Sequence, residues 1–194
     1  MKQIKQIEMG YSAVFLDKDG TLIPDVPYNV DPAKIELAAG AGQALRSLSH
    51  AGYKLIVISN QSGVARGYFP ESALAGVKER LQELLNPDHV ALSGFYYCPH
   101  HPTGAIEPYA IDCLCRKPKP GLILKAAKDH NVDLSVSWMI GDILNDVEAG
   151  HKAGCKTILI DNGNETEWIL SPDRTPDYRV ANLLQAATII QASR

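Results

Sequence analysis

Long apolar runs are missing from this chain. The N-terminal segment MKQIKQIEMG carries lysines, but only the short apolar run Ala13–Leu16 follows it. A secretory signal peptide needs a longer apolar stretch, and a membrane-spanning helix needs about 20 residues. We therefore expect a cytoplasmic protein that does not insert into a membrane.

The chain also has no large excess of positive or negative charge. The formal net charge is −3, and the lysines and arginines are scattered in ones and twos. The sequence has no basic stripe that would indicate nucleic-acid binding. It also has no acidic tail that would indicate a basic partner. Internal repeats, low-complexity tracts and linkers are absent as well. With 194 residues and 45% hydrophobic content, we expect one domain over residues 1–194 and predict a monomer.

Cysteine is limited to four residues, and three of them, Cys98, Cys113 and Cys115, gather near a histidine. In a chain without a signal peptide, this clustering favours a metal site over disulfides. The fourth, Cys155, stands in the run Ala-Gly-Cys-Lys and is expected to be a small buried apolar residue.

Short apolar runs alternate with longer segments of helical spacing. Prolines at the starts of segments 70–85 and 120–129 are typical of first helical positions. Doubly buried strands that alternate with helices predict an α/β fold, a Rossmann-like parallel sheet with helices on both faces. The expected strands are 12–16, 53–58, 95–97, 137–140 and 157–160, and the expected helices are 41–51, 70–85, 120–129, 146–153 and 183–190.

Polar side chains follow three of these strands. Asp17 and Asp19 come after SAVFL, Ser59 and Asn60 come after KLIVI, and Asp142 comes just after SWMI. In open α/β sheets, ligands bind outside the carboxyl ends of the strands. The sequence therefore predicts a functional site at that edge of the sheet.

Asp17 and Asp19 stand two residues apart in the string FLDKDGT, residues 15–21. In extended backbone both carboxylates point to the same side, toward one substrate, and Gly20 lets the chain turn away. An ordinary acidic turn after a strand could use the same residues. A calcium loop of the EF-hand type is excluded, because the apolar residues at 22–24 break its ligand pattern.

The string LDKDGT resembles the first motif of the haloacid dehalogenase (HAD) superfamily of phosphotransferases, and the likeness continues along the chain. Ser59-Asn60 resembles the second motif, Lys117 resembles the third-motif lysine, and Gly141-Asp142 with Asp146 resembles the acidic fourth motif. The segments between the motifs leave no room for a separate cap domain. We therefore expect a capless HAD fold whose loops recognise the substrate.

The resemblance implies a role for each motif residue. Asp17 would be the nucleophile that forms an aspartyl-phosphate, and Asp19 the general acid/base that protonates the leaving alcohol and then takes a proton from water. Ser59 and Asn60 would hold phosphate oxygens, and Lys117 would neutralise the transferring group.

A carboxylate that attacks a phosphate also needs a cation. Like-charge repulsion is on the order of 4 kcal/mol per unit-charge pair at ~4 Å with an effective dielectric of ~20. Oxygen ligands suit hard Mg²⁺. The expected ligands of a catalytic Mg²⁺ are Asp17, Asp142 and, by the resemblance, the backbone carbonyl of Asp19.

A second metal is expected in an inserted loop at about residues 98–115. Cys98-Pro-His100, twelve further residues and Cys113-Leu-Cys115 form a Cys₃His set. This stoichiometry is typical of closed tetrahedral zinc sites, so we predict a structural Zn²⁺. The alternatives are a chance cluster or one oxidised cysteine pair, and His101 could replace His100.

The cysteine pair ends directly before Arg116 and Lys117, so the metal would hold both cations at the active site. A second phosphate on the substrate would explain Arg116, because arginine binds phosphate as a two-pronged donor. A solvated surface arginine is the alternative.

The loop sequences narrow the resemblance to one family. The strings NQSGVARG (60–67), YYCPHHP (96–102) and CLCRKP (113–118) closely resemble the phosphatases of D-glycero-D-manno-heptose 1,7-bisphosphate, over roughly residues 12–161. The resemblance favours His100 as the zinc ligand. It also implies removal of the 7-phosphate from this phosphorylated small molecule, a step toward nucleotide-activated heptose for lipopolysaccharide or heptosylated glycans. The implied substrate contacts are Asp25, Val26, Pro27, Tyr28, Ser59, Asn60, Gln61, Ser62, Arg116 and Lys117.

One position departs from that family's pattern. The residue after Asp142 is commonly a lysine that contacts the substrate, and here it is Ile143, which removes a cation. Histidinol-phosphate phosphatases share the motifs and a similar zinc loop, but their second motif does not continue as Ser-Gly-Val-Ala-Arg-Gly. Another sugar or nucleotide phosphatase and a non-catalytic, zinc-stabilised binding module are the remaining alternatives. A degenerate module would be expected to lose Asp17 or Asp19, and both are present.

Overall fold

The computed structural model describes residues 10–193. Residues 1–9, which include the N-terminal lysines, and residue 194 lie outside the described part of the chain. Both ends of the expected 1–194 domain therefore lie outside it as well. Within residues 10–193, no helix is long and apolar enough to cross a membrane.

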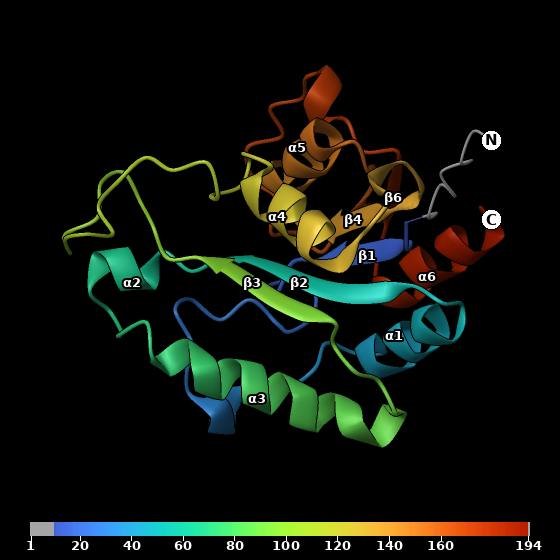
Figure 1. Cartoon of the computed structure of the whole chain (residues 1–194), viewed down its shortest axis with the longest axis horizontal. Helices are drawn as coiled ribbons and strands as arrows, with labels where there is room; N and C mark the ends of the chain where they lie inside the picture. The colour runs from blue at the N-terminus through green and yellow to red at the C-terminus, as the bar shows by residue number, and fades with distance from the viewer. Residues whose placement is uncertain (1–9, 194) are drawn as a thin grey trace, which may run out of the picture.

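Strands and helices alternate along the chain, as Figure 1 shows. The strands are β1 (Ala13–Leu16), β2 (Lys54–Asn60), β3 (Gly94–Cys98), β4 (Trp138–Gly141), β5 (Lys156–Ile160) and β6 (Tyr178–Val180). The α-helices are α1 (Ala41–His50), α2 (Gly63–Arg66), α3 (Ala73–Leu85), α4 (Gly121–His130), α5 (Leu144–Ala153) and α6 (Leu183–Ala192). Single 3₁₀ turns lie at Pro32–Lys34, Asn86–Asp88, Leu134–Val136 and Pro172–Arg174.

The strands form one sheet in the order β3-β2-β1-β4-β5-β6, and every neighbouring pair is parallel. Val14 of β1 is in register with Leu55 of β2 on one side and with Trp138 of β4 on the other. The strand order therefore reverses direction at β1, and such a switch point is where doubly wound sheets bind their ligands.

Helices cover both faces of this sheet (Figure 1). Val14 and Leu16 pack with the apolar side chains of α1, α3 and α6, whereas Ala13 and Phe15 pack with those of α4 and α5. Alternate residues of a strand point to opposite faces, so a strand buried on both faces is apolar throughout. This explains why the strands appear in the sequence as continuous apolar runs, and it confirms the predicted fold class.

The boundaries differ from the predicted ones for local reasons. Helix α3 begins at Ala73 and not at Pro70, because the amides of Ala73 and Leu74 bond three residues back and close a tight turn first. Helix α5 begins at Leu144, earlier than expected, since the Asp146 carboxylate accepts a hydrogen bond from the amide of Ile143 at 3.3 Å and caps the first turn. The single-turn helix α2 and the edge strand β6 were not predicted.

Candidate active site

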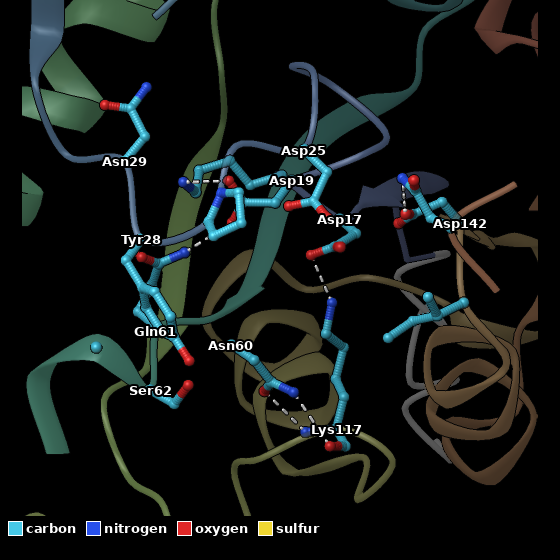
Figure 2. Close-up of a pocket in the computed structure, with 15 residues that line it drawn as sticks. Asp17, Asp19, Asp25, Tyr28, Asn29, Asn60, Gln61, Ser62, Lys117 and Asp142 are labelled. Carbon is cyan, nitrogen blue, oxygen red and sulfur yellow. Dashed lines mark hydrogen bonds and ion pairs between the residues drawn. The ribbon is translucent and has the colours of Figure 1, made fainter. Parts of the chain in front are cut away.

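The carboxyl ends of β1, β2 and β4 meet at one edge of the sheet and border a cavity of ≈ 310 Å³ (Figure 2). Its walls combine acids, amides and two lysines, with few apolar side chains. Strand β2 runs on to Asn60, so Ser59 and Asn60 belong to the strand itself and do not follow it. The lining residues are Asp17, Lys18, Asp19, Asp25, Pro27, Tyr28, Asn29, Asn60, Gln61, Ser62, Gly63, Lys117, Asp142, Ile143 and Asn164.

Lys117 lies at the floor of this cavity and is only 3% exposed. Its Nζ is 2.6 Å from Asp17 Oδ1 and 2.6 Å from Asp146 Oδ1, and it donates to the carbonyl of Ile58 at 2.9 Å. Burial acts to lower the pKa of Lys117, but Asp146 and Asp17 outweigh it, and the pKa stands above its ordinary value. The ammonium therefore stays charged beside the Asp17 carboxylate.

Asn60 holds the segment that carries Lys117. The Asn60 side chain donates to the Lys117 carbonyl at 3.1 Å and accepts from the Lys117 amide at 3.0 Å. Figure 2 shows both bonds. This two-point contact joins positions 57 residues apart in the chain and fixes where the lysine enters the cavity.

Three carboxylates gather beside Lys117: Asp17 and Asp142 line the cavity, and Asp146 is fully buried behind it. Asp17, Asp142 and Asp146 can each offer an oxygen so that the three atoms lie within 4.8 Å of one another. Burial, then the charges of Asp146 and Asp17, raise the pKa of Asp142 to about 8, and burial raises that of Asp146 to about 6. Buried oxygen donors whose mutual repulsion a cation would relieve are chemically suited to Mg²⁺.

Asp19 has a different environment. Burial raises its pKa above the ordinary value, against the opposing effect of Lys18, whose Nζ lies 2.7 Å from Asp19 Oδ1. Gln61 donates to Asp19 Oδ2 at 3.0 Å and to Ser59 Oγ at 2.8 Å. Ser59 is fully buried under this amide and does not line the cavity. A carboxyl with a raised pKa at a cavity wall is a candidate general acid/base.

The other implied substrate contacts divide into two groups. Asp25, Pro27, Tyr28, Gln61 and Ser62 line the cavity together with Asn60 and Lys117. Val26 and Arg116 do not line it. Val26 is half exposed, and Arg116 Nη1 lies 3.5 Å from the carbonyl of His100. Ile143 is part of the wall, so the position where a family lysine was expected is uncharged.

The predicted metal loop brings its four candidate ligands together. Cys98, His100, Cys113 and Cys115 can place their ligand atoms within 4.8 Å of one another. The sulfur atom of Cys115 lies 3.1 Å from the sulfur atoms of Cys98 and Cys113. These distances are too long for a disulfide bond, and the cysteines are free. The hydrogen bond between Cys115 and Cys98 is the main cause that lowers the pKa of Cys115 to about 5. Three sulfurs and one imidazole are donors that fit Zn²⁺.

The neighbouring histidine faces elsewhere. His101 Nε2 is 3.1 Å from Arg66 Nη2, and its Nδ1 accepts from the amide of Thr103 at 3.2 Å. His101 is therefore not part of the Cys/His cluster. Cys155 is buried, and burial raises its pKa to about 12, as suits a small apolar core residue.

Three contacts of this site were missed by sequence reasoning. Asp146 was assigned to the fourth motif, but its ion pair with Lys117 was not predicted. The hydrogen bond from Gln61 to Asp19 was not predicted either, because no sequence pattern near either residue indicates it. Asn164 was not considered, although its Nδ2 donates to Asp142 Oδ2 at 2.8 Å. The cluster of Asn162 and Asn164 just after β5, at the carboxyl edge of the sheet, was the available clue.

The doubly wound fold, the acids at the tips of β1 and β4 and the buried lysine between them define a HAD-like hydrolase. In agreement, a family model described as HAD-hydrolase-like matches residues 114–187. The solved structure of a HAD-like protein from Mesorhizobium loti superposes with a TM-score of 0.82 at 36% identity, covering 95% of this chain and 88% of that one.

Curated relatives and solved structures narrow the class of HAD-like hydrolases to one family. The D-glycero-beta-D-manno-heptose-1,7-bisphosphate 7-phosphatase of Haemophilus ducreyi is 45% identical over 157 residues, 80% of this chain and 86% of the relative. The D,D-heptose 1,7-bisphosphate phosphatase of B. bronchiseptica, solved with magnesium and phosphate, has a TM-score of 0.76 at 26% identity, with 94% and 99% of the two chains covered. The chain belongs to the family of heptose-1,7-bisphosphate 7-phosphatases and is a phosphoric monoester hydrolase.

Proposed function

We propose that this protein removes the 7-phosphate of D-glycero-D-manno-heptose 1,7-bisphosphate through an aspartyl-phosphate intermediate. The observation that carries the proposal is the 2.6 Å contact of Asp17 with the Lys117 ammonium, at the floor of a cavity that Asp19 and Asp142 also line. The names of the curated relatives support the choice of substrate and favour its β anomer.

In the first half of the reaction, an oxygen of Asp17 attacks the phosphorus atom, and the bond from phosphorus to the C7 oxygen breaks. The Lys117 ammonium offsets the charge that accumulates on the phosphoryl oxygens. Asp19, whose raised pKa lets it carry a proton, gives that proton to the departing alkoxide, so the sugar leaves as a neutral alcohol.

In the second half, Asp19 takes a proton from a water molecule as the water oxygen attacks the aspartyl-phosphate. Inorganic phosphate leaves, and the Asp17 carboxylate is restored. Gln61 orients Asp19 for both transfers through its hydrogen bond at 3.0 Å, and Asn60 keeps Lys117 in place. Ser59 acts through Gln61 in this scheme, because it is buried beneath that amide.

Asp17, Asp142 and the backbone carbonyl of Asp19 are the proposed holders of Mg²⁺. When bound, Mg²⁺ would screen the repulsion between the Asp17 carboxylate and the substrate phosphate. The clustering of Asp17 with Asp142 and Asp146 supports the site, and in this arrangement Asp146 serves to hold Lys117.

Cys98, His100, Cys113 and Cys115 are the proposed ligands of a structural Zn²⁺. The loop that they would close ends at Arg116, directly before Lys117. The proposed substrate contacts Asp25, Pro27, Tyr28 and Ser62 line the cavity, and Val26 and Arg116 would take part only through a change of side-chain position. A single domain over 1–194, a monomeric state and a cytoplasmic location stay predictions.

Substrate competition tests the proposal. Purified protein with Mg²⁺ should release phosphate from heptose 1,7-bisphosphate with a higher kcat/KM than from histidinol phosphate or from common sugar phosphates. Phosphorus NMR of the product should show that the 1-phosphate is retained. Faster turnover of histidinol phosphate, or loss of the 1-phosphate, would contradict the proposed function.

A further inference from the structure

The loop that follows β5 reaches back over the turn after β1 and into the active-site cavity. Asn162 Nδ2 donates to the carbonyl of Gly20 at 2.6 Å, and Asn162 Oδ1 accepts from the amide of Asn164 at 3.2 Å. Asn164 Nδ2 then donates to Asp142 Oδ2 at 2.8 Å. The first asparagine thus fixes the backbone that presents the second, and the second contacts a carboxylate of the proposed metal site.

The packing at this point leaves no spare volume. Gly20 has φ +76°, and a Cβ placed there would lie 2.0 Å from Asp142 Oδ2 and 2.5 Å from Asn164 Nδ2. Glycine is thus required both for the backbone conformation and for the close approach of the two side chains. The Asn164 amide and the Asp142 carboxylate can meet only because that position carries no side chain.

Asp142 has a neutral donor at each oxygen. Thr21 Oγ1 donates to Oδ1 at 3.2 Å, and Asn164 donates to Oδ2. An ionised carboxylate has about four lone-pair sites, so one hydrogen bond at each oxygen leaves sites free for a cation. A lysine or arginine in place of Asn164 would compete with a metal for Asp142. A carboxylate would add to the repulsion among Asp17, Asp142 and Asp146.

We propose that Asn164 is a positioning residue that orients the Asp142 carboxylate for Mg²⁺. This inference rests on the proposed function, because it assumes that Asp142 is a metal ligand. Groups that hydrogen-bond metal ligands typically contribute 10–100-fold to metal affinity, and Asn164 occupies that place for Asp142.

A purely structural role as a loop tether does not account for the contact. Asn162 already ties the loop to Gly20. Glu165 ties it to α5 by accepting from the amide of Leu144 at 2.7 Å, and it also accepts from the amide of Glu167 at 2.8 Å. The side chain of Asn164 is therefore free to serve the cavity that it lines.

The experiment measures Mg²⁺ binding without turnover. Isothermal titration of Mg²⁺ into the zinc-loaded protein gives Kd, and thermal unfolding across a Mg²⁺ series gives the same constant, since a ligand of the folded state stabilises it by RT ln(1 + [L]/Kd). The variants are Asn164→Ala and Asn164→Leu, the second of which keeps the branching of the side chain at Cγ and removes the donor. Asn145→Ala is the matched control, because Asn145 contacts Arg174 at 3.2 Å and lies outside the cavity.

We expect both Asn164 variants to bind Mg²⁺ about 10–100-fold more weakly, to unfold near the wild-type temperature without Mg²⁺, and to recover turnover at high Mg²⁺. The Asn145 control should keep the wild-type Kd. A Kd within about threefold of wild type in both Asn164 variants would overturn this inference alone. Absence of Mg²⁺ binding by the wild-type protein would overturn the proposed metal site, and the inference with it.

Discussion

Two regions of this protein gather ligand-type side chains in opposite ways. The strand-tip site, formed by Asp17, Lys117, Asp142 and Asp146, joins residues as much as 129 positions apart, and each of them is at most 8% exposed. The metal loop, residues 98–115, gathers its cluster within eighteen positions, and only Cys98 belongs to a strand or helix. The sheet therefore fixes the first cluster. The second is held by its own ligand contacts and by ties of the loop to neighbouring segments, such as the bond from Tyr109 to Glu71.

Because of this difference, we expect substitutions in the strand-tip site to affect mainly activity and substitutions in the metal loop to affect mainly stability. Parallel strands and two layers of helices hold the strand-tip acids, so a change there should remove activity and leave the fold. The metal loop has little regular structure, so a change there should loosen the chain first and affect activity through Lys117. The predictions that follow test this contrast, from the largest expected effect to the smallest.

Asp17→Asn should lower kcat by on the order of 10³-fold or more, because an amide cannot form the aspartyl-phosphate. The Lys117 ammonium keeps Asp146 as its partner, so the fold should persist. Steady-state phosphate release and acid-quench trapping of phosphoenzyme measure the effect, and circular dichroism checks the fold. Unchanged hydrolysis in this variant would refute the mechanism.

Cys113→Ser should cost the protein its zinc and on the order of 3–5 kcal/mol of stability, which corresponds to about 6–20 °C in Tm. Activity should fall as well, since Lys117 stands only two residues after Cys115. Metal analysis and thermal unfolding measure both effects. Cys155→Ala is the control, because Cys155 is buried outside the cluster and its loss should leave the zinc content at one per chain.

Asp142→Asn should change how stability depends on pH in Mg²⁺-free buffer. The pKa of Asp142 is raised from 3.8 to about 8 by burial and by Asp146 and Asp17. Between those values the folded protein binds more protons than the unfolded chain, so this group makes stability fall as pH rises. The variant lacks that penalty and should be the more stable protein at pH 8, with the difference vanishing toward pH 4.

Urea denaturation at several pH values measures this difference. Asp112→Asn is a suitable control, because Asp112 is 74% exposed and pairs with Lys119 at the surface. A gap between wild type and Asp142→Asn that does not vary with pH would show that Asp142 is ionised equally in both states.

Glu71→Ala should give the smallest effect. The Glu71 carboxylate accepts from Tyr97 of β3 at 3.0 Å and from Tyr109 of the metal loop at 2.7 Å, and it thereby ties the loop to the sheet. Removing it should cost about 1–3 kcal/mol, or about 2–12 °C in Tm, with kcat nearly unchanged. Glu79→Ala, on the exposed face of α3, should cost less than about 0.5 kcal/mol. Equal losses of stability in the two variants would mean that the hydrogen bonds of Glu71 to Tyr97 and Tyr109 do not stabilise the fold.

Much of the fold could be predicted from sequence, and the exceptions have physical causes. Strands buried on both faces leave continuous apolar runs, so five of the six strands were expected. Strand β6 leaves no such pattern, since two of its three residues are exposed at the edge of the sheet. Helix α2 is a single turn of four residues, too short to show helical periodicity.

The amino-acid sequence by itself determined which chemical groups this protein has and where the chain presents them. The string LDKDGT sets two acids at a strand end, and the Cys/His spacing sets a compact metal loop, because both depend on residues that are near neighbours in the chain. Only the tertiary structure decided the partners of these groups: Asp146 for Lys117, Gln61 for Asp19, and Asn164 for Asp142. Those choices depend on how loops from different strands pack over one sheet edge, where burial raises the pKa of Asp19, Asp142 and Asp146 and makes their neighbours decisive.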